Sequence, residues 1–255
     1  MNYFHLILTL LLGWLCGSII NYLADVLPGT RRLTKAGCAA CGHPYRTWEY
    51  LLLLPCKACG KHRRLRAVLV LGFSVLLTCA AWLFPPPLFQ DNLLQIPPLV
   101  LSVPILVLFG VIFTTDMEYH IILKEVSIAG AVIGLATGIL TVGAIETLIG
   151  GVAGFAIMLA FYYLGNVFSK WMARRRGQEI EEALGFGDVT MSAIIGFFLG
   201  WPNIISGLLL AIVLGGLISG GMIVFMLLRK KYEAFTAIPY APFLIIACLA
   251  LFYLI

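Results

Sequence analysis

Two aspartates at the edges of apolar segments are the residues best suited to acid–base chemistry. Asp116 follows the apolar segment that ends in Phe113-Thr114-Thr115, and Asp188 closes Gly185-Phe186-Gly187-Asp188 and opens another one. Ionisable groups at membrane depth are costly and usually functional. Two carboxyl groups held close together share a proton, so one can activate water while the other polarises a carbonyl group. This pattern predicts peptide-bond hydrolysis, with Asp116 and Asp188 as the catalytic pair.

The glycines before Asp188 fit this interpretation. Gly185 and Gly187 have no side chain, so an extended substrate backbone could approach Asp188 closely. The simpler alternative is that each aspartate meets water at a loop edge or caps a helix, with Asp188 as an ordinary N-cap. A Gly-x-Gly-Asp string is common by chance, so the pairing with Asp116 carries more of the argument. Glu118 could tune Asp116, but we expect it to be a solvated loop acid.

Four cysteines form a second candidate site. They occupy two CxxCG motifs, Cys38-Ala39-Ala40-Cys41-Gly42 and Cys56-Lys57-Ala58-Cys59-Gly60. Four thiolates on two tight turns suit structural zinc, and a site with four sulfur ligands leaves no position open for a catalytic water. The alternatives are redox cysteines, or ligands that have lost their metal. Nearby His43 and His62 are expected to be solvated, and the isolated cysteines to be packing residues: Cys16, Cys79 and Cys248.

The composition shows what kind of fold must position these groups. Of 255 residues, 61% are hydrophobic and 11% are charged, against about 25% charged in a soluble domain. The mean hydropathy is +1.01. Eight apolar stretches can be marked, at 3–24, 67–84, 96–114, 126–142, 144–168, 188–201, 203–228 and 235–254. The sequence therefore predicts an all-α polytopic membrane protein with about eight transmembrane helices, the first retained and the sixth short for a full crossing.

The basic residues predict an orientation. All 17 Lys and Arg residues fall after the first, third, fifth and seventh stretches, at 31–66, 124, 170–176 and 229–231. Such residues stay on the cytoplasmic side, so both termini should lie outside and both aspartates at the cytoplasmic face. No extended basic domain exists that would suit nucleic acid. We divide the chain into a first helix (1–27), a cytoplasmic zinc-knuckle loop (28–66), where disulfides are rare, and a transmembrane protease core (67–255).

Taken together, these motifs resemble type IV prepilin peptidases, a family of GxGD-type membrane aspartic proteases. The opening Gly17-Ser18-Ile19-Ile20-Asn21, followed by Leu27-Pro28, is similar to that family's GS-x-x-N…LP segment. The cysteine motifs, Asp116 and Gly185–Asp188 follow in the family's order, and Ile238-Pro239-Tyr240-Ala241-Pro242-Phe243 resembles its IP-x-x-PF signature. The set in this order is more specific than any one member, and it covers nearly the whole chain.

The resemblance implies a reaction and its partners. A short basic leader would be removed from prepilins or pseudopilins at the cytoplasmic face of a bacterial inner membrane. N-methylation of the new N-terminus with S-adenosylmethionine could follow. The chain departs from the family at Leu123, Lys124 and Thr190, and Arg64-Leu65-Arg66 opens the second span without the usual proline and glutamate. These departures weaken the methyltransferase expectation. The alternatives are an intramembrane GxGD protease with other membrane substrates, or a non-enzymatic transport or assembly protein.

Overall fold

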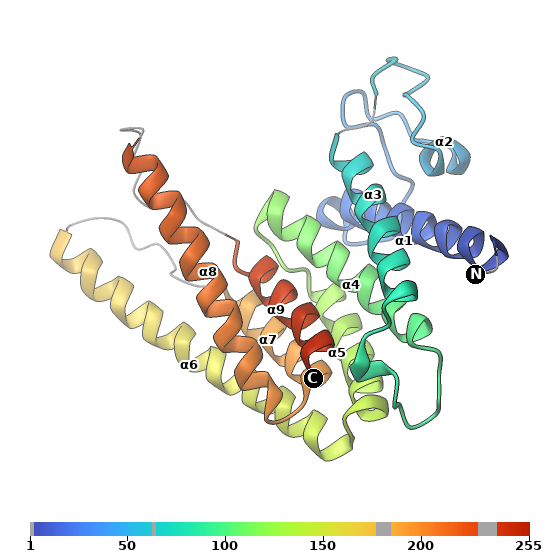
Figure 1. Cartoon of the computed structure of the whole chain (residues 1–255). Coiled ribbons are helices and arrows are strands. Elements are labelled where there is room, and N and C mark those ends of the chain that lie inside the picture. Colours follow the sequence, from blue (N-terminus) through green and yellow to red (C-terminus); the bar gives the residue numbers. More distant parts are fainter. Residues whose placement is uncertain (1–2, 63–64, 177–184, 229–238) are drawn as a thin grey trace. The chain divides into compact units, whose positions relative to one another are not determined.

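The computed structural model describes residues 3–62, 65–176, 185–228 and 239–255, and within them the chain is almost entirely helical (Figure 1). The elements are α1 (Tyr3–Thr30), α2 (Thr47–Leu51), α3 (Leu65–Leu83), the 3₁₀ helix η1 (Pro87–Phe89), α4 (Pro98–Tyr119), α5 (Lys124–Thr141), α6 (Ala144–Arg176), α7 (Phe186–Leu199), α8 (Asn203–Leu228) and α9 (Ala241–Leu254). No strand occurs in these residues, where backbone pairing between Gly37 and Pro44 forms an isolated bridge.

The prediction of an all-α membrane protein is confirmed. Within the described residues, six helices are long and apolar enough to cross a bilayer: α1, α3, α4, α5, α6 and α8. The other two apolar helices, α7 and α9, have 14 residues each, or about 21 Å at the helical rise, against about 30 Å of hydrocarbon. The eight predicted stretches thus correspond to eight helices, although residues 229–238, with the basic positions 229–231, lie outside the described part.

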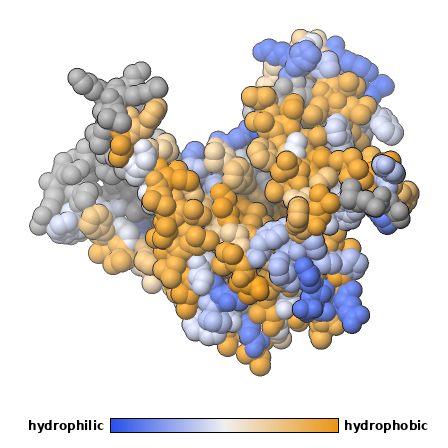
Figure 2. Space-filling view, viewed as in Figure 1, coloured by the Kyte–Doolittle hydropathy of each residue, from blue (hydrophilic) through white to orange (hydrophobic). Residues whose placement is uncertain are grey.

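Large apolar side chains cover the outer faces of these helices. In Figure 2 hydrophobic residues form most of the visible helical surface, and hydrophilic residues gather over the loop that contains α2. Residues such as Leu148, Val152 and Leu164 of α6 and Leu209 and Leu217 of α8 are all more than half exposed. Since apolar surface in water is unfavourable, so extensive an apolar exterior is what a bilayer-embedded protein requires.

The chain folds as two compact units, the first made of Met1–Gln90 and Gln95–Tyr119. In this unit α1 packs against α3 and α4. Small residues permit the close approach of α1 and α3, because a Cβ added to Gly17 would lie 2.7 Å from Ser74 Oγ. Buried Asn21 donates to the carbonyl of Ala67 (3.0 Å), so it joins α1 to the start of α3. This unit contains Asp116 and the four cysteines of the two CxxCG motifs.

The second unit, Asp91–Leu94 and His120–Ile255, is built around α7. This helix packs against α5, α6, α8 and α9. Its contact with α6 brings two backbones together, because a Cβ on Gly196 would overlap the carbonyl of Gly150 and one on Gly154 would overlap that of Ser192. Small residues are what allow close helix packing within a membrane. Asp188, Gly185 and Gly187 belong to this unit.

Candidate functional site

Asp116 lies inside a helix rather than after one. The helix α4 continues to Tyr119, and Asp116 is buried in its last turn. The preceding Thr114 and Thr115 donate their hydroxyl groups to the carbonyls of Gly110 (2.6 Å) and Val111 (2.9 Å), one turn earlier. These local bonds satisfy the hydroxyls within the helix. The sequence-based end of the span at residue 114 was therefore too early, and Asp116 is held on regular helical backbone.

Asp188 lies at the start of a helix, whereas Asp116 lies at the end of one. It is buried in the first turn of α7, whose N-cap is Gly185. The alternative that Asp188 is an ordinary N-cap is therefore wrong, since Asp188 is the third residue of the helix and its own N–H bonds to the Gly185 carbonyl (3.1 Å). Hydroxyl groups of Thr190 and Ser192 bond to the carbonyls of Gly187 and Asp188. A carboxylate in a first helical turn is stabilised by the helix dipole.

The two glycines have different surroundings. A Cβ added to Gly187 would lie 3.0 Å from Cβ of Ile122, so this glycine admits the segment that follows α4 close to the start of α7. The same atom on Gly185 would meet nothing nearer than Asp188 Oδ2 at 3.6 Å. Gly187 thus has a packing partner within its own unit, and the proposed role of Gly185 and Gly187 in substrate approach stays a prediction.

Tyr240 is a residue near Asp188 that sequence reasoning did not single out. It lies directly before α9, in the segment resembling IP-x-x-PF, of which Ile238 is outside the described residues. Tyr240 is partly buried, and the negative charge of Asp188 acts on its hydroxyl, so the two side chains lie within electrostatic reach of each other. Its place inside the C-terminal motif was the signal available from the sequence.

A charged cluster beside the end of α4 was also missed. Arg66, at the start of α3, bonds through Nη2 to Asp25 of α1 and through Nη1 to Glu118 of α4, the latter at 2.5 Å. The hydroxyl of Tyr50 donates to the second oxygen of Asp25 (2.6 Å). Glu118 is therefore an ion-paired residue of a helix with a side chain 24% exposed, so its expected position in a loop is wrong. Neighbouring Arg64 lies outside the described residues.

The cysteine motifs fold as two matching knuckles. In the first, the Gly42 N–H bonds to the Cys38 carbonyl (2.8 Å), and in the second the Gly60 N–H bonds to the Cys56 carbonyl (2.7 Å). Gly42 and Gly60 have φ angles of 71° and 69°. A side chain is strained in this left-handed region, so a glycine after each second cysteine lets the turn close. Both knuckles then present two sulfur atoms in the same way.

The four sulfur atoms match a zinc site. Their Sγ atoms all lie within 4.8 Å of one another, and the Cys38–Cys59 and Cys41–Cys56 separations are 3.7 and 3.6 Å. Tetrahedral Zn²⁺ with Zn–S bonds of about 2.3 Å places its sulfurs about 3.8 Å apart. No disulfide links these cysteines. His43 and His62 are exposed. The cluster is compatible with zinc bound by sulfur alone.

Electrostatics within the knuckles favours a cation. Backbone N–H groups of Ala40 and Cys41 lower the pKa of the Cys38 thiol to about 6. A backbone hydrogen bond at His43 lowers the pKa of Cys41, but burial and the three neighbouring sulfurs together raise it to about 12. Four thiolates repel one another at this distance unless a metal ion neutralises them.

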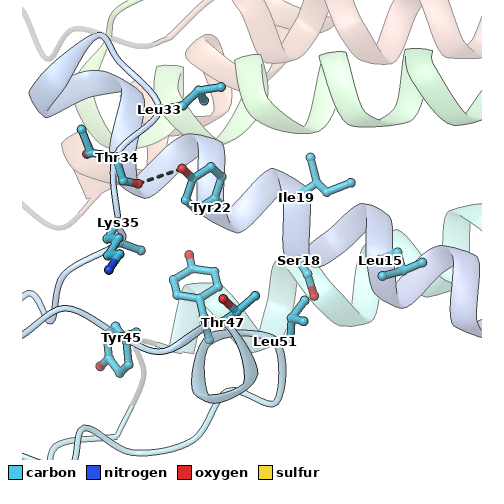
Figure 3. Close-up of a pocket in the computed structure, with 12 residues that line it drawn as sticks. Leu15, Ser18, Ile19, Tyr22, Leu33, Thr34, Lys35, Tyr45, Thr47 and Leu51 are labelled. Carbon is cyan, nitrogen blue, oxygen red and sulfur yellow. Dashed lines mark hydrogen bonds between the residues drawn. The ribbon is translucent and has the colours of Figure 1, made fainter.

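The knuckle loop has a small core of its own that rests on α1. Tyr45, Tyr50, Ala36, Cys38 and Cys56 are buried together with Val26 of α1, and Tyr22 packs against them. A groove of about 480 Å³ follows this contact from Leu15 and Ile19 of α1 to Lys35 of the loop (Figure 3). At its polar end the Tyr22 hydroxyl donates to the carbonyl of Thr34 (2.7 Å). The loop is therefore positioned by the same helix that carries Asp25.

Comparison with known proteins finds similarity to one family. Residues 103–220, which include both aspartates, match the model of the Type IV leader peptidase family. A prepilin leader peptidase/N-methyltransferase of Pseudomonas putida is 27% identical over 84% of this chain and 70% of its own length. Proteins of that name from Aeromonas hydrophila and Myxococcus xanthus are 24% and 26% identical, over 88% and 81% of this chain and 72% and 60% of their own lengths. No solved structure gives a significant match.

Fold and site together define a multi-pass α-helical membrane protein with a four-cysteine cluster beside its first helix. The sequence matches then place it more narrowly. Residues 103–220 are similar to the Type IV leader peptidase family, and the relatives that match most of the chain are named prepilin leader peptidase/N-methyltransferase.

Proposed function

We propose that this protein is an aspartic endopeptidase that removes the short basic leader of type IV prepilins or pseudopilins, with Asp116 and Asp188 as its catalytic residues. The observation that carries this proposal is the family match, since residues 103–220 contain both aspartates. Each is buried in a terminal turn of an apolar helix. An acidic group at such a depth destabilises the protein, so its presence there indicates a function.

The covalent chain permits the two aspartates to approach each other. Ile122 packs on Gly187, the residue before Asp188. The chain from Asp116 to Ile122 consists of the last helical turn and three further residues, which together span at most about 15 Å. A connection of this length does not prevent Asp116 from approaching Asp188, as the proposed mechanism requires.

The chemistry requires one ionised and one protonated carboxyl group. The ionised aspartate takes a proton from water as the oxygen attacks the scissile carbonyl carbon, while the protonated aspartate donates a hydrogen bond to the carbonyl oxygen. The tetrahedral intermediate collapses when the C–N bond breaks and the leaving amine receives a proton from the carboxyl pair. The pair ends with one proton, as it began, and titrates as a unit.

The basic loops support a cytoplasmic active face. Under the orientation predicted from Lys and Arg, the end of α4 and the start of α7 lie at the inner surface of the membrane. A prepilin leader would reach this surface before export. The relatives are named prepilin leader peptidases, which supports prepilins and pseudopilins as the substrate class.

Zinc would have a structural role in this scheme. Cys38, Cys41, Cys56 and Cys59 would hold it, and the ion would neutralise the thiolates and fix the two knuckles to each other. A loop of about 40 residues is at the size where a small domain needs a metal or a disulfide to be stable. The zinc loop would then be a rigid body against α1, next to the cluster of Asp25 and Arg66.

A second activity is favoured by the relatives' names, which include N-methyltransferase. After leader removal, the same protein would transfer a methyl group from S-adenosylmethionine to the free N-terminal amine. The amine nitrogen forms the new N–C bond and loses a proton, and S-adenosylhomocysteine leaves. Mass spectrometry of the processed product tests this directly, because methylation adds about 14 Da to a peptide that leader removal has already shortened.

The peptidase proposal is tested by replacing each aspartate. Asp116→Asn and Asp188→Asn keep the size of the side chain but cannot supply a carboxylate, so each should lower leader removal by at least about 10³-fold, within the range of general acid–base catalysis combined with loss of the shared proton. Purified variants are incubated with a prepilin, and cleavage is followed by the mass of the product. Retained membrane insertion and thermal stability show that the fold is intact.

The same assay separates the alternatives. A signal-peptide substrate is added in parallel, because an intramembrane GxGD protease would cut inside its apolar segment instead of at the end of a basic leader. An Asp116→Asn protein that still processes prepilin at the normal rate would end the aspartic mechanism. Failure of the wild-type protein to cleave either substrate would favour a transport or assembly function.

A further inference from the structure

Arg66 joins three helices of the first unit. Its two terminal nitrogens bond to Asp25 of α1 and to Glu118 of α4, while Arg66 itself lies in the first turn of α3. Its side chain is 15% exposed, less than either carboxylate. Arginine presents a planar fork of donors, so it can hold two carboxylates at fixed angles. The guanidinium is therefore placed to fix the relative position of α1, α3 and α4.

The bond to Glu118 falls where α4 is least supported by its own hydrogen bonds. Glu118 is the penultimate residue of the helix, and the last carbonyl groups of a helix have no partner within it. His120, just beyond, has a left-handed φ of 54°, so the helical path ends there. Helix ends of this kind fray unless something outside the helix holds them. The bond from Arg66 to Glu118 stabilises this helix end from outside the helix.

Asp116 lies on the same turn but on another face. Residues two apart on a helix differ by about 200° in direction and do not face each other. Consistent with this, Asp116 is 6% exposed, whereas Glu118 points to Arg66. Holding Glu118 therefore fixes both the rotation and the depth of the turn that carries Asp116, without contact between the two side chains.

The small energetic value of such pairs supports a geometric role. Partly exposed ion pairs contribute little to stability, because screening and lost side-chain entropy offset the attraction. Yet four segments supply groups to this cluster: Asp25, Tyr50, Arg66 and Glu118. A network that joins four segments restricts the positions of those segments relative to one another more than it stabilises the fold. Catalysis is sensitive to position, since a misplacement of about 1 Å can lower a rate about 100-fold.

We propose that Arg66 is a positioning residue for the peptidase reaction: it clamps Glu118 and Asp25, and so holds the terminal turn of α4 in the register that presents Asp116 to the substrate. Tyr50 extends the clamp to the cysteine loop through its bond to Asp25. This inference rests on the proposed function, in which Asp116 is catalytic.

The test compares Arg66→Met, Arg66→Lys and Glu118→Gln in purified full-length protein with a prepilin substrate. Arg66→Met should lower kcat about 100-fold with KM changed less than about threefold, because the chemistry and not substrate binding depends on the register of Asp116. Arg66→Lys keeps one of the two bonds and should recover part of kcat. The double variant Arg66→Met/Glu118→Gln should be no worse than Arg66→Met alone, since Arg66→Met already breaks the bond to Glu118.

A second measurement does not depend on activity. Hydrogen–deuterium exchange of the peptide covering residues 112–119 should become faster in Arg66→Met and Glu118→Gln, because the last turn of α4 then opens more often. Met117→Leu is the matched control, as its side chain is on the same turn and 52% exposed. Lys170→Met controls for loss of a positive charge at an exposed position. Both controls should leave kcat and exchange unchanged.

The outcomes separate the inference from the proposed function. If Arg66→Met and Glu118→Gln keep wild-type kcat and exchange while Asp116→Asn is inactive, the clamp is wrong and the peptidase assignment stands. A lower melting temperature with an unchanged kcat in the folded fraction also rejects the clamp, since Arg66 would then be merely structural. If Asp116→Asn remains active, the proposed function fails first.

Discussion

At the scale of single residues, Gly187 has two possible reasons to lack a side chain. The sequence suggested space for a substrate backbone beside Asp188. The structure adds a close neighbour, because a Cβ at this position would come within 3.0 to 3.2 Å of three atoms of Ile122. Contacts this short force the neighbour to move by a few tenths of an ångström. The two explanations differ in what a compensating change at Ile122 would do.

The variant Gly187→Ala should lower kcat about tenfold if packing against Ile122 is the reason for the glycine, since the start of α7 and Asp188 would shift together. Adding Ile122→Ala removes two of the three crowded atoms and should restore most of that loss. Initial rates of prepilin cleavage measure both variants. The matched change Gly185→Ala makes only ordinary contacts, with no atom nearer than 3.6 Å, and should have a smaller effect. A double variant as inactive as Gly187→Ala would favour the substrate-approach explanation.

The sequence identified the aspartates and cysteines because their residue types and spacing are distinctive. It could not assign Glu118, because an acid two residues after Asp116 looks the same whether it is solvated or paired. Its partner, Arg66, is 52 positions away in sequence, and the helix packing that joins them has no local signature. Tyr240 was missed for the same reason, since its relation to Asp188 depends on how α9 meets α7.

At the scale of elements, the knuckle loop was predicted more fully than any helix end. Two CxxCG repeats specify two identical turns, and both glycines have the left-handed φ that the pattern requires. By contrast, the end of α4 was placed at residue 114, although the helix runs to Tyr119. Hydropathy marks where the membrane ends, whereas a helix continues past that point when polar residues such as Thr115 and Glu118 find partners.

Replacing Cys38 by serine should remove a sulfur ligand and lower the zinc content to well below one ion per chain, because three sulfurs hold Zn²⁺ more weakly than four. Thermal unfolding in detergent should begin at a lower temperature, with the loop as the first part to open. Elemental analysis of the purified protein gives the zinc content. Cys79→Ser, a half-buried cysteine of α3, is the matched control and should keep the metal. Unchanged zinc in Cys38→Ser would refute the structural-zinc site.

At the scale of the whole molecule, hydropathy and charge together predicted eight helices and an orientation. The number of apolar helices agrees with the described structure, while the short α7 and α9 show that apolar stretches need not be full crossings. Both are heavily buried by other helices of their unit, unlike the lipid-facing α6 and α8. Hydropathy measures how apolar a segment is, but it does not distinguish contact with lipid from contact with protein.

The orientation remains a prediction, and labelling of introduced cysteines can test it. Lys35 is exposed in the knuckle loop, and Asp91 is exposed in the connection between α3 and α4, where residues 84–97 include no Lys or Arg. If basic loops are cytoplasmic, a membrane-impermeant maleimide added to intact spheroplasts should label Asp91→Cys. Lys35→Cys should be labelled only after the membrane is opened. The unmodified protein, with zinc retained, measures background from the native cysteines. Labelling of Lys35→Cys in intact spheroplasts would reverse the predicted orientation. Asp116 and Asp188 would then face the outside of the membrane, where they could not meet a leader before export.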